Sequence, residues 1–330
     1  MNLANSTILV TGGCGLIGST LIDQLLAEDD VAEVRVIDNL SRGTRANLAA
    51  ARDTGRVELF DRDIRDFTSI RPLFDGVDVV FHQAALRITA CATHWRECQE
   101  VLVDGTYNVV EACVAAGVRR LVAASSASVY GLAKHFPTPE DHTLANNRTW
   151  YGAAKIANEA LYRAFHEMTG LDYVALRYFN VYGPRMDTHG KYTEVLIRWL
   201  DCLDRGERPK IFGDGGQTMD FVYVGDVARA NRLAAASEVT DQVFNVATGR
   251  ETSLNELYQL VLAVTDRGGP PPEYLPERTV NPVRRRWAAV DRAKQLLSFE
   301  AQVSLEDGLR QLVEWRETMR SAECGMRSDV

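Results

Sequence analysis

The chain has 330 residues, of which 46% are hydrophobic and 25% charged, and its formal net charge is −8. This composition suits a globular protein with one large α/β domain and a smaller lobe. The basic residues are dispersed apart from one short run at 284–286, which argues against a nucleic-acid-binding surface. The N-terminal segment lacks signal-peptide features, and no apolar run approaches the roughly 20 residues that span a bilayer. We therefore expect a cytoplasmic protein with no membrane partner.

The six cysteines stand at positions 14, 91, 98, 113, 202 and 324. They form neither a CxxC pair nor a His–Cys cluster, so the sequence indicates no metal site and no disulfide framework. We expect reduced thiols that are buried or partly buried.

Short apolar runs alternate with helical patterns through the first half of the chain. Strands are expected at 6–11, 34–39, 57–63, 78–85, 119–126 and 172–181, and helices at 15–28, 67–75, 98–116 and 151–169. Continuous apolar strands separated by helices predict a parallel sheet covered on both faces. The predicted fold class is therefore α/β, a Rossmann-like doubly wound parallel sheet.

The character of the chain changes near residue 180. The second half indicates a helix over 193–205, strands at 209–215 and 219–224, a Gly- and Pro-rich loop over 264–277, and a last helix that begins at Ser304 with Asp307 as a capping partner. We divide the chain into a nucleotide-binding domain at 1–180 and a substrate-binding lobe at 181–330. Some elements of the lobe are expected to cross back into the first domain.

The segment TGGCGLIG (11–18) joins the first strand to the first helix, with Gly12, Gly15 and Gly18 in GxxGxxG spacing. These glycines permit a tight turn, the approach of a pyrophosphate and close helix–strand packing. The first helical residues, Leu16 and Ile17, bring free backbone amides that attract phosphate. The motif predicts a dinucleotide site.

Asp38 ends the second strand, 20 residues after Gly18. A carboxylate at that point accepts hydrogen bonds from the adenosine ribose and repels a 2′-phosphate. NAD is therefore the expected cofactor, although the nearby Arg42 is a feature that would suit NADP.

The segment WYGAAK places Tyr151 and Lys155 four residues apart, on one face of the expected helix 151–169. An ammonium group near a phenol favours the phenolate and so lowers the pKa of the tyrosine. The pair could remove a proton from an alcohol while hydride leaves the same carbon. A half-exposed tyrosine beside a surface lysine is the alternative interpretation, and it is weakened by the position of the pair after a dinucleotide motif.

These motifs, with HQAA (82–85), SSASVYG (125–131), RYFNVYGPR (177–185) and NVATG (245–249), identify the chain as a member of the extended short-chain dehydrogenase/reductase family. It resembles that family's nucleotide-sugar epimerases and dehydratases along almost its whole length. The resemblance implies a bound NAD, a lobe that closes on a nucleoside-diphosphate sugar, and a homodimer formed through helices near 100–116 and 153–169. Besides the residues already named, it places these residues at the cofactor: Asn39, Ser41, Gly43, Asp63, Ile64, Ala84, Ala85 and Tyr178.

The resemblance assigns the catalytic hydroxyl to Ser126, 25 residues before Tyr151. Dehydratases of the family carry Asp-Glu directly after this serine, and its decarboxylases commonly carry a Glu two positions on. Here Ala127 and Ser128 occupy those positions and cannot act as acids or bases. C4 epimerisation of a UDP-hexose is therefore the expected reaction. An oxidoreductase, a decarboxylase, a dehydratase and a non-catalytic NAD sensor stay open as alternatives.

The residues expected at the substrate are Arg87, Ser126, Ser128, Tyr151, Asn180, Arg185 and Arg285, with Lys191 and Tyr192 as weaker candidates. Two positions depart from the family pattern. Met219 replaces an arginine that binds substrate phosphate, and Leu102 replaces an asparagine. A cation from the run at 284–286 could compensate for Met219, or the substrate could differ from a standard UDP-hexose.

Overall fold

The computed structural model describes residues 2–188, 195–266, 268–277 and 283–327, with side chains up to residue 321. Its main element is a seven-stranded sheet. The strands, from one edge to the other, are β11 (Gln242–Val246), β6 (Asp172–Tyr178), β5 (Arg120–Ser126), β4 (Val79–His82), β1 (Thr7–Thr11), β2 (Glu33–Asp38) and β3 (Val57–Asp61). All six pairings are parallel, which confirms the predicted doubly wound sheet.

Alternate residues of each strand enter different hydrophobic cores, because successive side chains of a strand point to opposite faces. In β1, Ile8 and Val10 pack with one layer of helices while Leu9 packs with the other. The first layer comprises α1 (Leu16–Glu28), α2 (Ala49–Asp53), α9 (Val224–Ala236) and α11 (Asp291–Leu297). The second layer comprises α3 (Phe67–Ile70), α6 (Gly105–Ala116) and α7 (Trp150–Thr169).

Caps define the ends of the helices that matter for function. The Thr149 side chain accepts a hydrogen bond from the Gly152 N–H at the start of α7, and Gly170 ends that helix with φ +78°. The last helix, α12 (Leu305–Arg327), follows Ser304, whose hydroxyl accepts a hydrogen bond from the Asp307 N–H at 3.1 Å. The capping pair predicted at Ser304 and Asp307 is thus confirmed.

The expected helix 98–116 is interrupted. It consists of α5 (Trp95–Gln99), a π-helical segment η3 (Glu100–Asp104) and α6. A further short helix, α4 (Ile88–Cys91), precedes it. The expectation of reduced cysteines is wrong for Cys91 and Cys98, which form a disulfide between α4 and α5 with their Cα atoms 5.1 Å apart. Cys14, Cys113 and Cys202 are free thiols.

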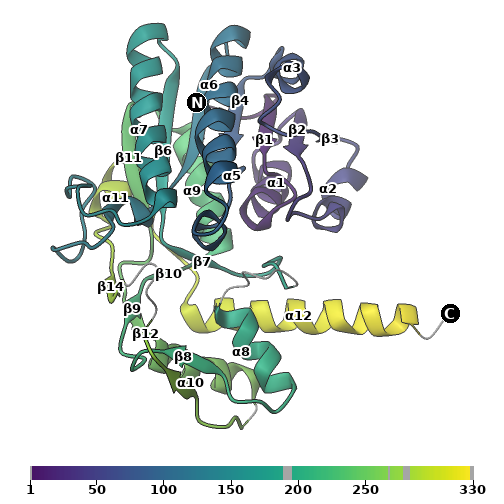
Figure 1. The fold of residues 1–330 in the computed structure, drawn as a ribbon. Coiled ribbons are helices and arrows are strands. Elements are labelled where there is room, and N and C mark those ends of the chain that lie inside the picture. Colours follow the sequence, from purple (N-terminus) through teal and green to yellow (C-terminus); the bar gives the residue numbers. More distant parts are fainter. Residues whose placement is uncertain (1, 189–194, 267, 278–282, 328–330) are drawn as a thin grey trace.

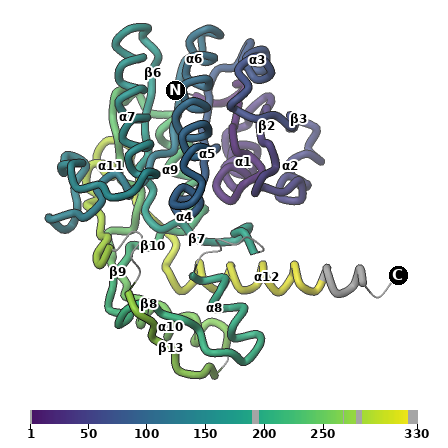
Figure 2. The backbone as a smooth tube through the Cα atoms, in the orientation of Figure 1, coloured from purple at the N-terminus to yellow at the C-terminus, as the bar shows by residue number. Residues whose placement is uncertain are grey.

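The second half of the chain forms a lobe beside the carboxyl ends of the sheet strands (Figure 1). Its elements are β7 (Asn180–Tyr182), α8 (Val195–Asp204), β8 (Lys210–Phe212), β9 (Thr218–Met219), β10 (Phe221–Tyr223), β12 (Thr252–Ser253), α10 (Leu254–Thr265), β13 (Glu273–Leu275), β14 (Arg285–Arg286) and α12. The expected strand 172–181 is split into β6 and β7, because β7 leaves the main sheet and pairs with β10. Figure 2 shows α8, α10 and α12 gathered on this side of the molecule.

Three elements from beyond residue 180 belong to the main sheet and its covering layer, namely β11, α9 and α11. β11 pairs with β6, and the amide of Gln24 on α1 donates a hydrogen bond to the carbonyl of Gly225 on α9. The division at residue 180 stays a prediction. Within the described residues, no helix is both long and apolar enough to cross a membrane.

Candidate active site

The glycine turn between β1 and α1 is packed so closely that side chains would not fit. Gly12 has φ +70°, and a Cβ there would lie 2.7 Å from the Ala84 backbone nitrogen. A Cβ on Gly18 would overlap the carbonyl oxygen of Gly12. Gly15, at the N-cap of α1, offers no side-chain cap, so the first amides of the helix face the cleft without a side-chain acceptor. This arrangement fits the phosphates of a dinucleotide.

Asp38 links the glycine turn to the end of β2. One carboxylate oxygen accepts the Cys14 N–H at 2.9 Å and the other accepts the Leu40 N–H at 2.8 Å. Burial raises the pKa of this carboxyl, while these two backbone hydrogen bonds oppose the rise. Each oxygen keeps a lone pair for a further donor, as a ribose diol would require.

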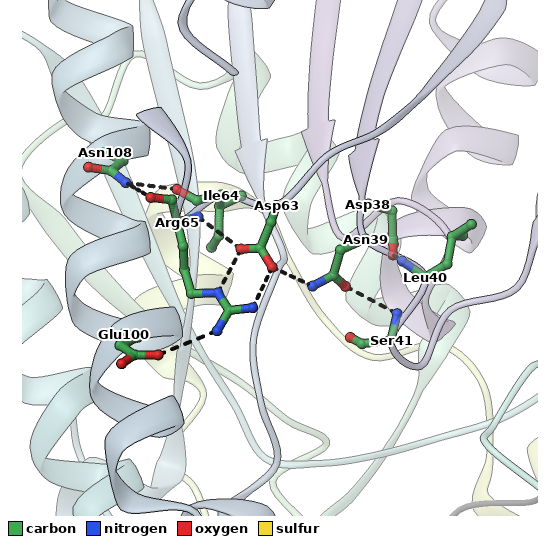
Figure 3. Close-up of polar contacts among 9 residues, drawn as sticks. All are labelled: Asp38, Asn39, Leu40, Ser41, Asp63, Ile64, Arg65, Glu100 and Asn108. Carbon is green, nitrogen blue, oxygen red and sulfur yellow. Dashed lines mark hydrogen bonds and ion pairs between the residues drawn. The ribbon is translucent and has the colours of Figure 1, made fainter. Parts of the chain in front are cut away.

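Just beyond the ends of β2 and β3, Asn39 and Asp63 meet in a chain of charged and polar side chains (Figure 3), and both residues line the cleft described below. Asp63 accepts hydrogen bonds from the Asn39 amide at 2.8 Å and from two guanidinium nitrogens of Arg65 at 2.9 and 2.7 Å. Arg65 lowers the pKa of Asp63 to about 2. Arg65 also reaches Glu100 at 3.4 Å, while the Asn108 amide donates to the Ile64 carbonyl at 2.9 Å.

The sheet and the lobe enclose a cleft of about 1840 Å³. Most residues predicted for the cofactor and the substrate line it: Gly12, Gly15, Leu16, Ile17, Gly18, Asp38, Asn39, Ser41, Arg42, Gly43, Asp63, Ile64, Ala84, Ala85, Arg87, Ser126, Ser128, Tyr151, Tyr178, Asn180 and Arg185. Two predicted residues, Lys155 and Arg285, are not among its lining. Lys191 and Tyr192 lie outside the described residues.

Ser126 ends β5, and Tyr151 and Lys155 lie on the first turns of α7, which packs against that strand. The Lys155 ammonium is buried and donates to the Ala124 carbonyl at 2.6 Å, and its Nζ lies 6.0 Å from the centroid of the Tyr151 ring. Burial lowers the pKa of Lys155 to about 8, against the raising effect of the Glu159 carboxylate. The Ser126 hydroxyl oxygen accepts the Ser128 N–H at 3.1 Å. The lysine thus lies behind the cleft wall, close to the ring of Tyr151.

His82, at the end of β4, links the end of β1 to the start of α6. Its ring nitrogens lie 2.7 Å from the Thr11 hydroxyl and 3.0 Å from the Thr106 hydroxyl. Burial, with a smaller effect of Lys155, lowers its pKa to about 3, so the ring is neutral. Leu102 lies in the π-helical segment, and its carbonyl accepts hydrogen bonds from the Thr106 hydroxyl at 2.7 Å and from the Asn158 amide at 2.8 Å. Asn158 therefore supplies an amide beside position 102, where the family's asparagine is missing.

The arginines predicted on the substrate side have different surroundings. Arg185 forms an ion pair with Asp23 of α1 at 2.7 Å, so its charge joins the lobe to the sheet domain. Arg87 is largely buried and lies 3.9 Å from Asp187. Asn180 begins β7 and lines the cleft next to them.

Within the run 284–286, the predicted Arg285 and its neighbour Arg286 have different surroundings. Arg285 is exposed and bound to Glu251 through two contacts of 2.7 Å, with the Phe136 and Trp287 rings 4.9 and 5.0 Å from its guanidinium carbon. Arg286 is only 7% exposed and lines the cleft. Its Nη2 has no hydrogen-bond partner among the described residues. Arg285 and Arg286 are adjacent on a strand, so their side chains project to opposite sides. The sequence could indicate this difference only after a strand had been assigned to these residues.

The sheet, the glycine turn and the cleft define a Rossmann-type nucleotide-binding enzyme. Residues 8–247 match the model of the NAD dependent epimerase/dehydratase family, and the chain belongs to this family. NAD is the cofactor of the family, and the residues that surround the glycine turn fit it. The predicted membership and cofactor are thereby confirmed.

Similar proteins cover nearly the whole chain. A UDP-glucose 4-epimerase of Mycolicibacterium smegmatis is 38% identical over 93% of this chain and 97% of its own. The crystal structure of a UDP-glucose 4-epimerase from Thermotoga maritima with UDP-glucose is 35% identical, with a TM-score of 0.87 over 95% of this chain and 99% of that one. The complex of the Thermus thermophilus UDP-glucose 4-epimerase with NAD is 31% identical, with a TM-score of 0.82 over 94% and 99%.

Relatives with other reactions share the same architecture. A UDP-N-acetyl-alpha-D-glucosaminuronate decarboxylase of Bacillus cytotoxicus is 29% identical over 93% of this chain and 96% of its own. The chain is thus an NAD-dependent enzyme of the nucleotide-sugar epimerase type, and its particular reaction has to be argued from the residues of its own site.

Proposed function

We propose that this enzyme inverts C4 of a nucleoside-diphosphate hexose, most simply a UDP-hexose. The observation that carries the proposal is the residue set around Ser126. Ser126 and Tyr151 line the cleft and Lys155 lies buried behind its wall, whereas the two positions after Ser126 hold Ala127, which is buried, and Ser128. Neither of these side chains can exchange a proton at neutral pH, so the acid–base groups that elimination uses at these positions are missing.

Tyr151, Ser126 and Lys155 each have a separate role in the proposed reaction. Tyr151, as phenolate, takes the proton of the C4 hydroxyl and later returns it. The Ser126 hydroxyl orients the same oxygen by a hydrogen bond. The Lys155 ammonium stabilises the phenolate from behind the cleft wall. When bound, NAD supplies the acceptor and donor for the hydride at C4, so the reaction needs no external oxidant.

Inversion also requires that the sugar turn over while its nucleotide stays bound. We assign the anionic end of the substrate to Arg286, whose buried guanidinium lines the cleft with one nitrogen unpaired among the described residues. A phosphate oxygen would satisfy that donor and compensate its burial. Arg87, Ser128, Asn180 and Arg185 stay proposed substrate-side residues.

The decisive experiment is product analysis by NMR after incubation with UDP-glucose, UDP-N-acetylglucosamine and UDP-glucuronate in separate reactions. We expect inversion at C4 for at least one of them without consumption of added NAD. Release of CO₂, or a 4-keto-6-deoxy product, would assign the enzyme to the decarboxylases or the dehydratases instead. Binding of all three sugars without any conversion would favour the NAD-sensor alternative.

A homodimer is part of the proposal. Among the described residues, large apolar side chains are exposed on α5, α6 and α7: Trp95 (69%), Tyr107 (44%) and Met168 (69%). Exposed apolar side chains on α7 and on two helices that pack against it favour contact with a second copy. Light scattering coupled to size-exclusion chromatography tests this, with Tyr107→Glu expected to yield monomers. Cytoplasmic residence stays a prediction.

A further inference from the structure

A buried network of side chains lies directly behind the proposed catalytic residues. The Glu159 carboxylate on α7 accepts a hydrogen bond from the Ser125 hydroxyl at 2.5 Å and a forked pair from Arg177 at 2.9 and 2.7 Å. Arg177 also donates to the Tyr130 hydroxyl at 2.9 Å and to the Glu140 carbonyl at 2.7 Å. All of these side chains are buried, so water cannot replace their partners.

The network is built from the same elements as the active site. Glu159 follows Lys155 by one helical turn and Tyr151 by two, so the three share one face of α7. Ser125 and Arg177 are register partners on β5 and β6, and Ser125 directly precedes Ser126. The single carboxylate of Glu159 therefore joins the helix of the tyrosine–lysine pair to the strand end that carries the serine.

The charges around Lys155 give this carboxylate a second role. The titratable groups that face the lysine are His82 of β4, which is neutral, Tyr151 of α7, and Glu159. Among these groups, Glu159 is the anion, and its carboxylate raises the pKa of Lys155. Glu159 also faces Arg177 of β6 and the hydroxyls of Tyr130 and Tyr162. A buried ammonium without an anion nearby tends to lose its proton.

We propose that Glu159 is a positioning residue of the reaction: held by Ser125 and Arg177, it keeps Lys155 charged and fixes the end of β5 against α7. The inference rests on the proposed role of Tyr151 and Lys155. Glu159 does not line the cleft, so it acts through these residues and not on the substrate.

The test compares Glu159→Gln with Glu140→Gln. Glu140 is an equally buried carboxylate, 7% exposed like Glu159, and it accepts the Asn245 N–H at 2.9 Å within the same region. The Glu140→Gln change removes a buried carboxylate and keeps the Glu159 carboxylate next to Lys155. Both variants and the wild type are purified with NAD, and their Lys155 signal is titrated by NMR after ¹³Cε labelling of lysine.

Removal of the Glu159 charge should lower the pKa of Lys155 by about 1 unit or more, while Glu140→Gln leaves it within a few tenths of the wild type. In the rate profile, turnover is lost as pH rises through the pKa of Lys155, so the alkaline limb of Glu159→Gln should move to lower pH. Glu159→Asp retains the charge and should restore part of this limb. Ser125→Ala, a milder change, should reduce kcat several-fold with KM nearly unchanged.

An unchanged Lys155 titration in folded Glu159→Gln would overturn the inference, as would an equal shift in Glu140→Gln. The NMR titration needs no turnover, so it answers the question even if the enzyme fails to invert C4. Absence of C4 inversion in the wild type, by contrast, counts against the proposed function alone. Should Glu159→Gln not fold, the Ser125→Ala kinetics and the Glu159→Asp titration decide.

Discussion

Arg286 is the direct partner of Met219 in the parallel pairing of β14 with β9. Met219 stands where the family resemblance places a phosphate-binding arginine, and Arg286 adds a guanidinium on the neighbouring strand. Burial lowers the pKa of Arg286 to about 10, which leaves it charged at neutral pH. The strand pair thus offers one cation at this position of the cleft, supplied from a different strand.

Replacement of Arg286 by alanine is expected to weaken substrate binding. A charge-assisted hydrogen bond is worth about 2 kcal/mol, so KM should rise roughly 30-fold with a smaller change in kcat. The matched variant is Arg285→Ala, which removes the adjacent but exposed arginine that is bound to Glu251. Steady-state kinetics that show equal KM values for the two variants would contradict the assignment.

Replacement of Gly12 by alanine should release NAD. Gly12 and Gly117 both have φ +70°, so alanine strains the backbone equally at the two positions, by about 1 kcal/mol. Only at Gly12 would the new Cβ collide with backbone, at 2.7 Å from the Ala84 nitrogen, whereas nothing lies within 4 Å at Gly117. Calorimetry and the NAD content of the purified proteins should therefore separate Gly12→Ala from Gly117→Ala.

Replacement of Tyr151 by phenylalanine should abolish proton transfer and leave the cleft intact. We expect kcat to fall by roughly 10²–10⁴-fold, the usual contribution of a general acid–base group. Bound NAD and the melting temperature should change little. Tyr107→Phe, at an exposed tyrosine of α6, serves as the control for the loss of a phenol hydroxyl. Full turnover in Tyr151→Phe would refute its role as the base.

The buried charge of Lys155 should make stability depend on pH in a defined direction. Its pKa falls from 10.5 in the unfolded chain to about 8 in the folded protein, and the cause is burial. Below pH 8 the folded state must hold a buried ammonium, so the cost is complete. Between pH 8 and 10.5 the folded protein has released a proton that the unfolded chain still binds, so stability rises with pH.

This effect is measured by urea unfolding at several pH values, as the difference in unfolding free energy between the wild type and a variant without Lys155. Relative to Lys155→Met, the wild type should gain about 2 kcal/mol of unfolding free energy between pH 7 and pH 10. Lys294→Met, which removes an exposed lysine bound to Glu300, should show no such gain. Parallel curves for the wild type and Lys155→Met would mean that folding does not lower the pKa of Lys155.

Local patterns made most of the sheet and the nucleotide site predictable. Buried parallel strands read as apolar runs, so the expected strand 119–126 differs from β5 by one residue at its start. The glycine turn and Asp38 lie in one short strand–turn–helix–strand unit, where spacing along the chain implies proximity. The helix that carries Tyr151 and Lys155 could also be predicted, because its pattern is local in the sequence.

The remaining features depend on contacts between distant segments. The pairing of Glu159 with Arg177 joins a helix to a strand, and a sequence pattern cannot tell a buried ion pair from two solvated charges. The Cys91–Cys98 disulfide depends on the turn between α4 and α5, which the helical pattern did not show. Arg285 and Arg286 are adjacent in sequence and differ only in the side of β14 from which each projects.

The path of the chain through the sheet has a consequence for biosynthesis. The chain leaves the sheet at Tyr178 and returns to it only at Gln242, as β11, after the intervening α9 has covered α1. On the ribosome the nucleotide-binding half cannot complete its sheet edge until β11, and with it the first part of the lobe, has emerged. A fragment that ends near residue 180 would expose the edge of β6 and one face of α1 to aggregation. We therefore expect the two halves to fold stably only as parts of one chain.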